Sequence, residues 1–383
     1  MSELNEIKSS TIGWDIGGAH LKAVQLDKDG HLLNALQLPC QLWRGLHTLE
    51  SAMQTILRTF KIKPMHANHV ITMTGELVDL FENRHSGVLE IAQFCANLLG
   101  KQCQFYAASK EFVTVEQVAL NTGYIASTNW HASASMLAKH INDALFIDIG
   151  STTTDIIAIE AGKVSSPALS DASRLQQGTL VYSGVVRTPV MALAQKISFA
   201  GFETNVMAEY FATMADVYRL TGQLPQAADM AETADGQGKS QQQSARRLAR
   251  MLGFDVEDKP ITAWIQLAFA CREIQLKQLK TAILKHLKPN MPIIGAGAGS
   301  FLVAQLAAEL NCTYLTIDSA LAFNSTSTLT INPTLSTTVA VSNYQSSDLL
   351  AADLLPINNL DVCFPAYAVA RLSLNHPPKA NLA

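Results

Sequence analysis

The chain has 383 residues, of which 48% are hydrophobic and 16% charged, and its formal net charge is −4. This length allows two domains of about 150 residues each, and the charge balance provides no basic surface for nucleic acid. No run of about 18 apolar residues occurs and the N-terminus is polar, so we expect neither a membrane partner nor a signal peptide, and a cytoplasmic location.

The six cysteines stand singly, without a C-x-x-C pair, and the ten histidines form no cluster. Neither a structural zinc site nor a disulfide framework is therefore indicated. We expect buried or idle thiols in a reducing compartment.

The first predicted element is a β-hairpin over residues 11–35. An apolar strand ends near Asp15, Gly17 and Gly18 follow, and the alternation of apolar and polar residues resumes at Leu21. Glycine is the usual residue where a turn requires a positive φ. We therefore interpret the pattern as a strand, a tight turn whose glycines have positive φ, and a second strand.

Beyond this hairpin, periodicity predicts a helix over 46–60, a strand over 68–73 and a helix over 87–99. The stretch TMTGELVD places Glu76 directly after the strand. In a catalytic interpretation, Glu76 contacts an amine or orients an acceptor. In a structural one, Thr74 caps a helix and Glu76 lies in its first turn.

The hairpin pattern recurs over residues 144–165, one domain length further along the chain. An apolar strand ends at Asp148, and a turn leads to Asp155 and a second apolar strand. The turn consists of Gly150, Ser151, Thr152 and Thr153. A repeat at this distance predicts two related domains with one hairpin each.

The two turns indicate a shared chemistry. Glycines let backbone N–H groups approach phosphate oxygens, and hydroxyl groups add donors. A carboxylate repels phosphate but holds Mg²⁺, usually through water. We therefore predict that Asp15 and Asp148 hold Mg²⁺ in a cleft where both hairpins clamp a polyphosphate. Ordinary hairpins with turn glycines are the structural alternative.

The stretch YSGVVRTPV places Tyr182 and Arg187 between a strand and a helix that begins at a proline, as in many substrate loops. Long helices are predicted near 205–221, 243–252 and 261–286.

The polar segment 227–244 between these helices is predicted to be a mobile loop. Arg246, Arg247 and Arg250 follow it and are expected on a solvated helix face. The GQGKS sequence within the segment is not a P-loop, because Thr233 stands where the motif requires glycine and no strand precedes it.

A third glycine-rich stretch spans residues 291–310. A short strand enters Gly295, Gly297 and Gly299, and Ser300 opens a helix. A strand and an acidic residue follow, which imitates a dinucleotide-binding fingerprint. The third glycine of that fingerprint would fall at Ser300, and no run of βαβ units follows, so the dinucleotide interpretation is the less favoured one.

These three stretches together resemble a known superfamily. WDIGGAHLK, DIGSTTTD and IIGAGAGS are similar, in order and spacing, to the phosphate-1, phosphate-2 and adenosine motifs of the actin, sugar-kinase and Hsp70 superfamily. Residues 72–88, 178–190 and 233–255 resemble hallmarks of its hydantoinase/oxoprolinase A group. Within that group the chain looks most like the tetrahydromethanopterin-linked C1-transfer pathway proteins, which are related to the archaeal aminomethylfuran alkyltransferase of methanofuran biosynthesis.

The resemblance implies an α/β fold with two related actin-like (ribonuclease H-like) domains, whose mixed sheets are flanked by helices and enclose a ligand cleft. The first domain would cover residues 1–135 and the second 140–323. Residues 324–383 would contain a polar segment and a C-terminal helix, over 364–372, that returns to the first domain.

The resemblance also implies a transferase that joins an aminomethylfuran-methyl diphosphate to a phenolic acceptor of tyramine or tyrosine type and releases diphosphate. Mg²⁺ near Asp15 and Asp148 would stabilise the leaving group, and Glu76 or Asp155 would take the phenolic proton. The phosphate or nucleotide groups would be Gly17, Gly18, Lys22, Gly150, Ser151, Thr152, Thr153, Gly295, Gly297 and Gly299. Tyr182 and Arg187 would contact the small-molecule substrates.

Lys22 is a departure from the family pattern, because the hydrolytic oxoprolinases usually have an aspartate there. A lysine at the mouth of the turn favours binding of a diphosphate over the ATP-driven opening of a lactam, unless Lys22 is merely a solvated strand residue. The alternatives are an ATP-dependent hydantoinase/oxoprolinase-type hydrolase, a small-molecule kinase with ATP in the same clamp, and a non-enzymatic nucleotide-gated protein.

Overall fold

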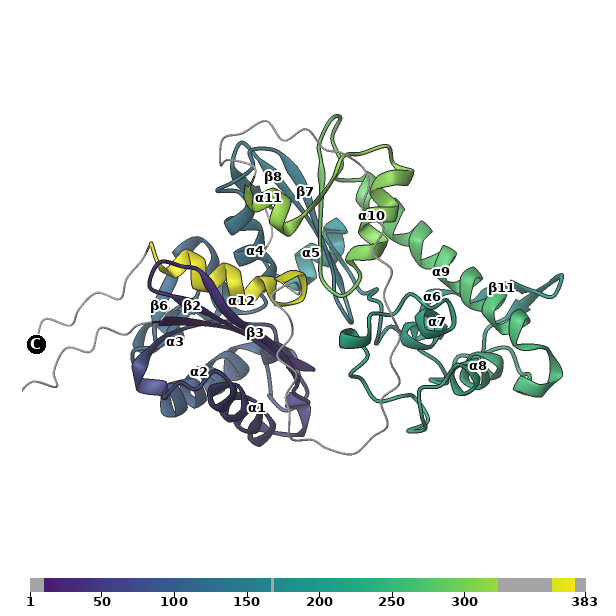
Figure 1. Ribbon diagram of the computed structural model, residues 1–383, viewed down its shortest axis with the longest axis horizontal. Helices are drawn as coiled ribbons and strands as arrows, with labels where there is room; N and C mark the ends of the chain where they lie inside the picture. Colours follow the sequence, from purple (N-terminus) through teal and green to yellow (C-terminus); the bar gives the residue numbers. More distant parts are fainter. Residues whose placement is uncertain (1–9, 167–168, 323–359, 376–383) are drawn as a thin grey trace, which may run out of the picture.

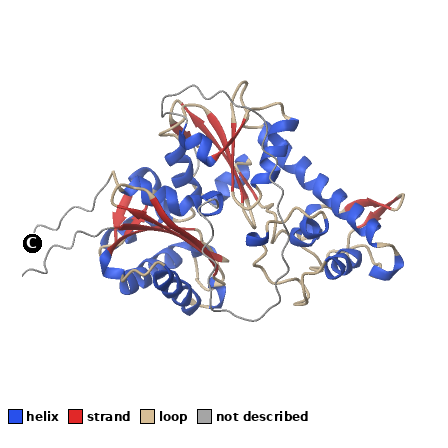
Figure 2. Ribbon diagram, in the orientation of Figure 1, coloured by secondary structure: helices blue, strands red, loops and turns tan. Residues whose placement is uncertain are grey.

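The computed structural model describes residues 10–166, 169–322 and 360–375, so the polar segment 324–359 lies outside the described residues. Two sheets, one in each half of the molecule, are surrounded by helices (Figure 1). Figure 2 shows that the strands are confined to these sheets and one small outlying hairpin. None of the described helices is both long and apolar enough to cross a membrane.

The first sheet is mixed, with strand order β3-β2-β1-β4-β5-β6. Its strands are β1 (Ser10–Ile16), β2 (His20–Asp27), β3 (Leu32–Pro39), β4 (Ala67–Met73), β5 (Gln104–Tyr106) and β6 (Phe112–Thr114). β1 pairs antiparallel with β2 and parallel with β4. β1 is buried along its whole length because helices cover both of its faces.

The side chains of β1 alternate between two helical layers. Ile12, Trp14 and Ile16 pack against α1 (Leu46–Thr59) and α2 (Arg84–Leu99). On the opposite face, a Cβ on Gly13 would lie 2.0 Å from the carbonyl oxygen of Ala366. The missing side chain therefore lets α12 (Leu360–Ser373) approach the strand directly.

The second sheet repeats this topology, with strand order β10-β8-β7-β13-β14 and β9 beside β8. Its strands are β7 (Ala144–Ile149), β8 (Thr154–Glu160), β9 (Lys163–Ser165), β10 (Leu180–Val181), β13 (Ile293–Ala296) and β14 (Tyr314–Thr316). β7 pairs antiparallel with β8 and parallel with β13, as β1 does with β2 and β4. The prediction of an α/β fold with two related mixed sheets, each flanked by helices, is confirmed.

Helices also cover both faces of the second sheet. Leu145, Ile147 and Ile149 share a core with α9 (Ile261–Leu284) and α10 (Ser300–Glu309). Ala144 and Phe146 face the other way, toward α12 and α4 (Asn129–Leu137). Since α12 also packs on the first sheet, α4 and α12 lie between the two sheets and fix how they face each other.

The remaining helices and strands are peripheral. They are α3 (Val118–Ile125), α5 (Asp171–Gln177), α6 (Val190–Leu193), β11 (Lys196–Phe199), β12 (Phe202–Asn205), α7 (Met214–Leu220), α8 (Gln241–Arg250) and α11 (Ile317–Ala322). The helices expected over 46–60, 243–252 and 261–286 are confirmed as α1, α8 and α9. The helix expected over 205–221 is wrong in its first half, because β12 ends at Asn205 and α7 begins at Met214.

The outer helical region contradicts two predictions from polarity. Arg247 is fully buried, and its guanidinium lies 2.7 Å from Asp216 and 2.9 Å from Asp235. Arg219 joins Asp216 to Asp229, at 2.8 and 2.6 Å. Segment 227–244, expected to be a mobile loop, is therefore held by buried ion pairs, and Arg247 does not lie on a solvated face. Charged residues become core residues here because each has a partner.

Candidate active site

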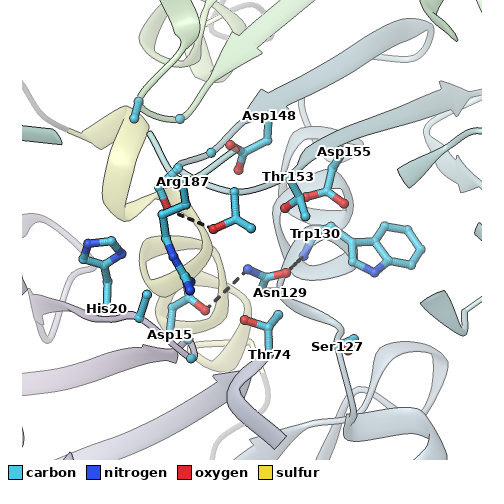
Figure 3. A pocket seen from close by; sticks show the side chains of 18 of the residues that line it. Asp15, His20, Thr74, Ser127, Asn129, Trp130, Asp148, Thr153, Asp155 and Arg187 are labelled. Atoms are coloured by element: carbon cyan, nitrogen blue, oxygen red, sulfur yellow. Dashed lines mark hydrogen bonds between the residues drawn. The ribbon is translucent and has the colours of Figure 1, made fainter. Parts of the chain in front are cut away.

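A pocket of about 290 Å³ lies between the two sheets, and both hairpins contribute to its wall. Asp148 and Asp155 face it from the second sheet, and Asp15 and Thr74 from the first (Figure 3). The candidate residues that line it are Asp15, Gly17, Gly18, Lys22, Asp148, Gly150, Ser151, Thr152, Thr153, Asp155, Tyr182, Arg187 and Gly297. Glu76, Gly295 and Gly299 are not part of its wall.

Both hairpin turns close in the same way. The N–H of Gly17 donates to the carbonyl of His20 at 3.0 Å, and the N–H of Gly150 donates to the carbonyl of Thr153 at 2.8 Å. Of these turn glycines, none has the positive φ expected from the sequence. Gly18 is required for another reason, the close approach of Val78, because a Cβ at position 18 would lie 2.8 Å from Cγ1 of Val78.

Residues 183–188 form the floor beneath the second turn. The N–H groups of Val185 and Val186 donate to the carbonyls of Gly150 and Ser151, at 3.1 Å each. A Cβ on Gly184 would lie 2.5 Å from the backbone nitrogen of Thr152. This segment therefore fixes the shape of the turn and carries Arg187 to the pocket wall.

The two hairpins differ in the charges that they pair. Asp15 lies opposite Lys22 in the β1–β2 register, and Lys22 Nζ is 3.1 Å from Asp15 Oδ2. At the corresponding place in the second hairpin, Asp148 lies opposite Asp155. Lys22 and Asp155 are thus equivalent by position and opposite in charge. Like charges in direct opposition destabilise a sheet unless other groups compensate them.

Only one aspartate of the second hairpin is compensated. The guanidinium of Arg174 lies 2.7 Å from Asp155, whereas Asp148 forms no ion pair with any described residue. Burial and the neighbouring Asp155 raise the pKa of Asp148 to about 7. A cation beside Asp148 would stabilise its ionised form and offset the free-energy cost of a buried carboxylate.

Mg²⁺ suits the oxygens at Asp148, because it prefers carboxylate and water ligands. Asp15 suits it less, since Oδ2 bonds Lys22 and Oδ1 lies 3.5 Å from the amide of Asn129. The residues therefore fit a magnesium site that is centred on Asp148. Asp15 instead holds the Lys22 ammonium, and the pKa of Lys22 is raised against burial by Asp15 and Asp148.

Arg187, like Asp148, is a charged residue of the pocket wall that has no ion-pair partner among the described residues. Its side chain runs across the pocket (Figure 3). The guanidinium lies over the ring of Trp43, 5.2 Å from its centroid. Burial, Lys22 and Arg187 lower the pKa of His20 to about 4. This end of the pocket thus presents cations and neutral donors to an anion.

Glu76 lies behind the wall at the other end of the pocket. It is fully buried, and Oε1 accepts a hydrogen bond of 2.7 Å from Ser127 Oγ, which does line the pocket. Thr74 makes no side-chain cap, and only one turn of 3-10 helix follows it. Glu76 therefore does not face the pocket as a direct catalytic contact would, because only Ser127 connects it to the pocket. It also does not lie in the first turn of a helix that Thr74 caps through its side chain.

Comparison with known proteins identifies the family of the chain. The family model for hydantoinase/oxoprolinase matches residues 68–331. The chain belongs to this family.

Two relatives of the chain have the same name, (4-{4-[2-(gamma-L-glutamylamino)ethyl]phenoxymethyl}furan-2-yl)methanamine synthase. The protein from Methanocaldococcus jannaschii is 32% identical over 252 residues, which cover 66% of this chain and 74% of the relative. The protein from Methanococcus vannielii is 31% identical over 169 residues, covering 43% and 76%. Both relatives are synthases, and the chain is accordingly an enzyme.

Among solved structures, the family member is similar to component A of the Acidaminococcus fermentans (R)-2-hydroxyglutaryl-CoA dehydratase, with 11% identity over 95% of this chain and 96% of that one and a TM-score of 0.43. A nucleotide-free acetone carboxylase gives 11% identity over 79% and 67%, with a TM-score of 0.49.

The glycine-rich stretch 291–310 contributes one of its three candidate glycines, Gly297, to the pocket wall. Gly297 has φ +81, and a Cβ there would lie 2.2 Å from Asp148 Oδ1. Gly295 and Gly299 instead allow close packing against Tyr314 and Ile149. Of the three glycines, only Gly297 therefore lines the pocket, and it does so beside the carboxylate of Asp148.

Sequence reasoning missed several residues of the wall. Asp171 and Arg174 come from the short helix α5, Asn129 and Trp130 from the start of α4, and Ser127 from the turn that precedes α4. The guanidinium of Arg174 lies 4.0 Å from the centroid of a Trp130 ring. No motif marks these positions, and only the packing of α4 between the sheets brings them to the site.

Proposed function

We propose that the chain is a transferase that joins the furfuryl carbon of an aminomethylfuran-methyl diphosphate to a phenolic acceptor of tyramine or tyrosine type and releases diphosphate. The product would be a precursor of a methanofuran-type C1 carrier. The observation that carries the proposal is the arrangement of charges in the pocket: Asp148 and Arg187 lie between two backbone turns, and neither forms an ion pair with a described residue. A magnesium diphosphate complements this arrangement.

The printed name of the two relatives supports the same reaction. It describes a furan that bears a methanamine and a methylene group bonded to a phenoxy oxygen. An enzyme that makes such an ether must join a furfuryl carbon to a phenol oxygen. We extend that bond-forming step to this chain.

The residues of the pocket suit departure of diphosphate. Mg²⁺ at Asp148 would supply charge neutralisation for the leaving group. Arg187 and Lys22 add positive charge, and the N–H groups and hydroxyls of the Gly150–Thr153 turn supply donors. Asp15 holds the Lys22 ammonium in place through the 3.1 Å contact. The bond from the furfuryl carbon to the diphosphate oxygen breaks, and the electron pair leaves with diphosphate.

The opposite end of the pocket suits the aromatic acceptor. Tyr182 and Leu77 are exposed side chains of the wall, and Val78, which follows Leu77 in sequence, also lines the pocket. Asp155 and Glu76 are the carboxylates proposed to take the phenolic proton. Asp155 is bonded to Arg174 at 2.7 Å, so Glu76 is the freer of the two.

One observation favours the alternative, an ATP-dependent hydantoinase/oxoprolinase-type hydrolase or a small-molecule kinase. Gly297 and Ala298 border the pocket, where the resemblance places an adenosine. In that case the clamp would hold ATP and a carboxylate would act as base.

The experiment supplies the purified protein with Mg²⁺ and either a furfuryl diphosphate plus tyramine or ATP plus lactams and small alcohols. We expect release of diphosphate and formation of the aryl ether without ATP. Arg187→Ala should lose most turnover, whereas Arg246→Ala on an exposed surface should not. Stoichiometric ATP hydrolysis without ether formation would contradict the transferase.

A further inference from the structure

Ser127 lies between two carboxyl groups at one end of the pocket. Its Oγ is 2.7 Å from Glu76 Oε1 and 3.3 Å from Asp171 Oδ2. Ser127 and Asp171 line the pocket, while Glu76 is fully buried behind them. A hydroxyl has one proton and can donate to one carboxylate at a time. Both contacts are hydrogen bonds only when one of the two carboxyl groups is protonated.

Glu76 is the carboxyl group that exchanges this proton. Asp171 is bonded to the guanidinium of Arg84 at 2.5 Å, which stabilises its charged form. Glu76 has no such partner, and among the described residues its second oxygen, Oε2, has no hydrogen bond. Burial raises the pKa of Glu76 to about 7; Asp171 on α5 and Arg84 on α2 are the charged groups that face it, and they act in opposite directions.

The backbone holds Ser127 in this position at a cost. Its φ is +54, a region that residues other than glycine rarely adopt. Such conformations persist where the surrounding structure requires them, often at functional sites. Here the conformation places a hydroxyl between the pocket and a buried acid.

The acceptor end of the pocket adjoins these groups. Tyr182 lines it with 58% of its surface exposed. Partial burial and then Asp171 raise the pKa of its phenol, and Arg187 and Arg84 oppose this. An aromatic acceptor beside Tyr182 would bring its hydroxyl toward Ser127.

We propose that Ser127 relays the acceptor's proton to Glu76, while Asp171 and Arg84 hold the Ser127 hydroxyl in position. The proposal rests on the transferase function above. As the phenol oxygen bonds to the furfuryl carbon, its proton moves to Ser127 Oγ, and the proton of Ser127 moves to Glu76 Oε1. The carbon–diphosphate bond breaks and its electron pair leaves with diphosphate, so Glu76 ends as a neutral acid.

The kinetic test compares Glu76→Gln with Glu82→Gln, a matched change at an exposed position six residues further along the chain. Asp148 has a pKa in the same range, so the assays use Mg²⁺ concentrations that keep Asp148 ionised. The base is the ionised form of Glu76, so the wild-type rate should then rise with pH through about 7 and level off. Glu76→Gln should lower turnover roughly a hundredfold and abolish that rise. Glu82→Gln should keep both. More acidic phenols, which need less help to lose their proton, should recover much of the loss in Glu76→Gln.

Ser127 is tested separately, because its position tolerates few residues. Ser127→Gly relieves the positive φ and removes the hydroxyl, whereas Ser127→Thr keeps a hydroxyl. We expect Ser127→Gly to lose turnover while folding normally, and Ser127→Thr to retain part of it. Full activity in Ser127→Gly would overturn the relay.

An activity-free measurement completes the test. Infrared difference spectra of the substrate-free protein should show carbonyl stretches of protonated carboxyls that titrate near pH 7, from Glu76 and from Asp148. In an Asp148→Asn background only the band of Glu76 should remain, and adding Glu76→Gln should remove it. If the wild type forms ether but Glu76→Gln keeps its pH profile, the relay is wrong and the transferase stands. If the wild type forms no ether with any phenol, the transferase is wrong and the relay falls with it.

Discussion

Replacing Lys22 tests the reaction most directly, because Lys22 stands where hydrolytic relatives of the group usually have an acid. Its ammonium is 3.1 Å from Asp15, and its side chain remains 23% exposed to the pocket. A charge-assisted contact to a diphosphate contributes about 1.5–3 kcal/mol. Lys22→Met should therefore lower kcat/KM for the furfuryl diphosphate by about tenfold to hundredfold. Lys22→Asp should lower it further, because it adds repulsion.

The structure also supplies a way to separate this effect from folding. Lys22→Met leaves Asp15, which is only 2% exposed, without its partner, and an uncompensated buried charge is destabilising. The double variant Asp15→Asn/Lys22→Met removes both charges and should recover the Tm but not the turnover. Lys28→Met, at an exposed position on the same hairpin, is the control.

Two results would refute this reasoning. Recovery of wild-type kcat/KM in the double variant would mean that Lys22 serves only to neutralise Asp15. Stoichiometric ATP consumption together with tolerance of Lys22→Asp would remove the transferase altogether and favour an oxoprolinase-like or kinase activity.

Three further predictions follow from the pocket and the core. Asp148→Asn should raise the Mg²⁺ concentration needed for turnover. The pKa of Asp148 is about 7 in the folded protein, above its value in the unfolded chain, so its ionisation destabilises the fold. Without metal, the Tm of the wild type should therefore fall relative to that of Asp148→Asn as pH rises from about 4 to 7. Gly297→Val should impair diphosphate turnover and any ATP binding alike, measured by kinetics and calorimetry, because the new Cβ would meet Asp148. Arg247→Met should cost roughly 3–5 kcal/mol in urea unfolding by stranding Asp216, whereas Arg246→Met, which is exposed, should change stability by less than about 0.5 kcal/mol.

The repeated hairpins could be predicted from the sequence because the pattern that marks them is local. Asp15 and Asp148 each end an apolar strand and precede a short turn, so strand periodicity alone locates them. The register then follows from turn length, and with it the pairing of Asp15 with Lys22. That ion pair was therefore within reach of the sequence, although only a solvated Lys22 or one that binds an anion was considered.

The rest of the site depends on tertiary packing. Ser127 and Trp130 reach the pocket because α4 is packed between the two sheets, which no local pattern specifies. The prediction that Arg247 is exposed was wrong. An arginine on a polar helix has the same local sequence whether it is solvated or, as here, buried against Asp216 and Asp235 from other segments. Polarity predicts exposure only when no partner is available.

The two halves of the pocket are alike in backbone and unlike in charge, and this difference bears on the chemistry. In the first half Asp15 is neutralised by Lys22 from the facing strand. In the second half the facing residue is Asp155, which is satisfied by Arg174, so Asp148 remains without a cation among the described residues. A duplicated fold that bound metal with equal strength in both halves would need an acid at position 22. Under the proposed function, lysine at this position would confine Mg²⁺ to the second half and leave an ammonium in the first, an arrangement suited to a ligand that carries more negative charge than one Mg²⁺ can neutralise.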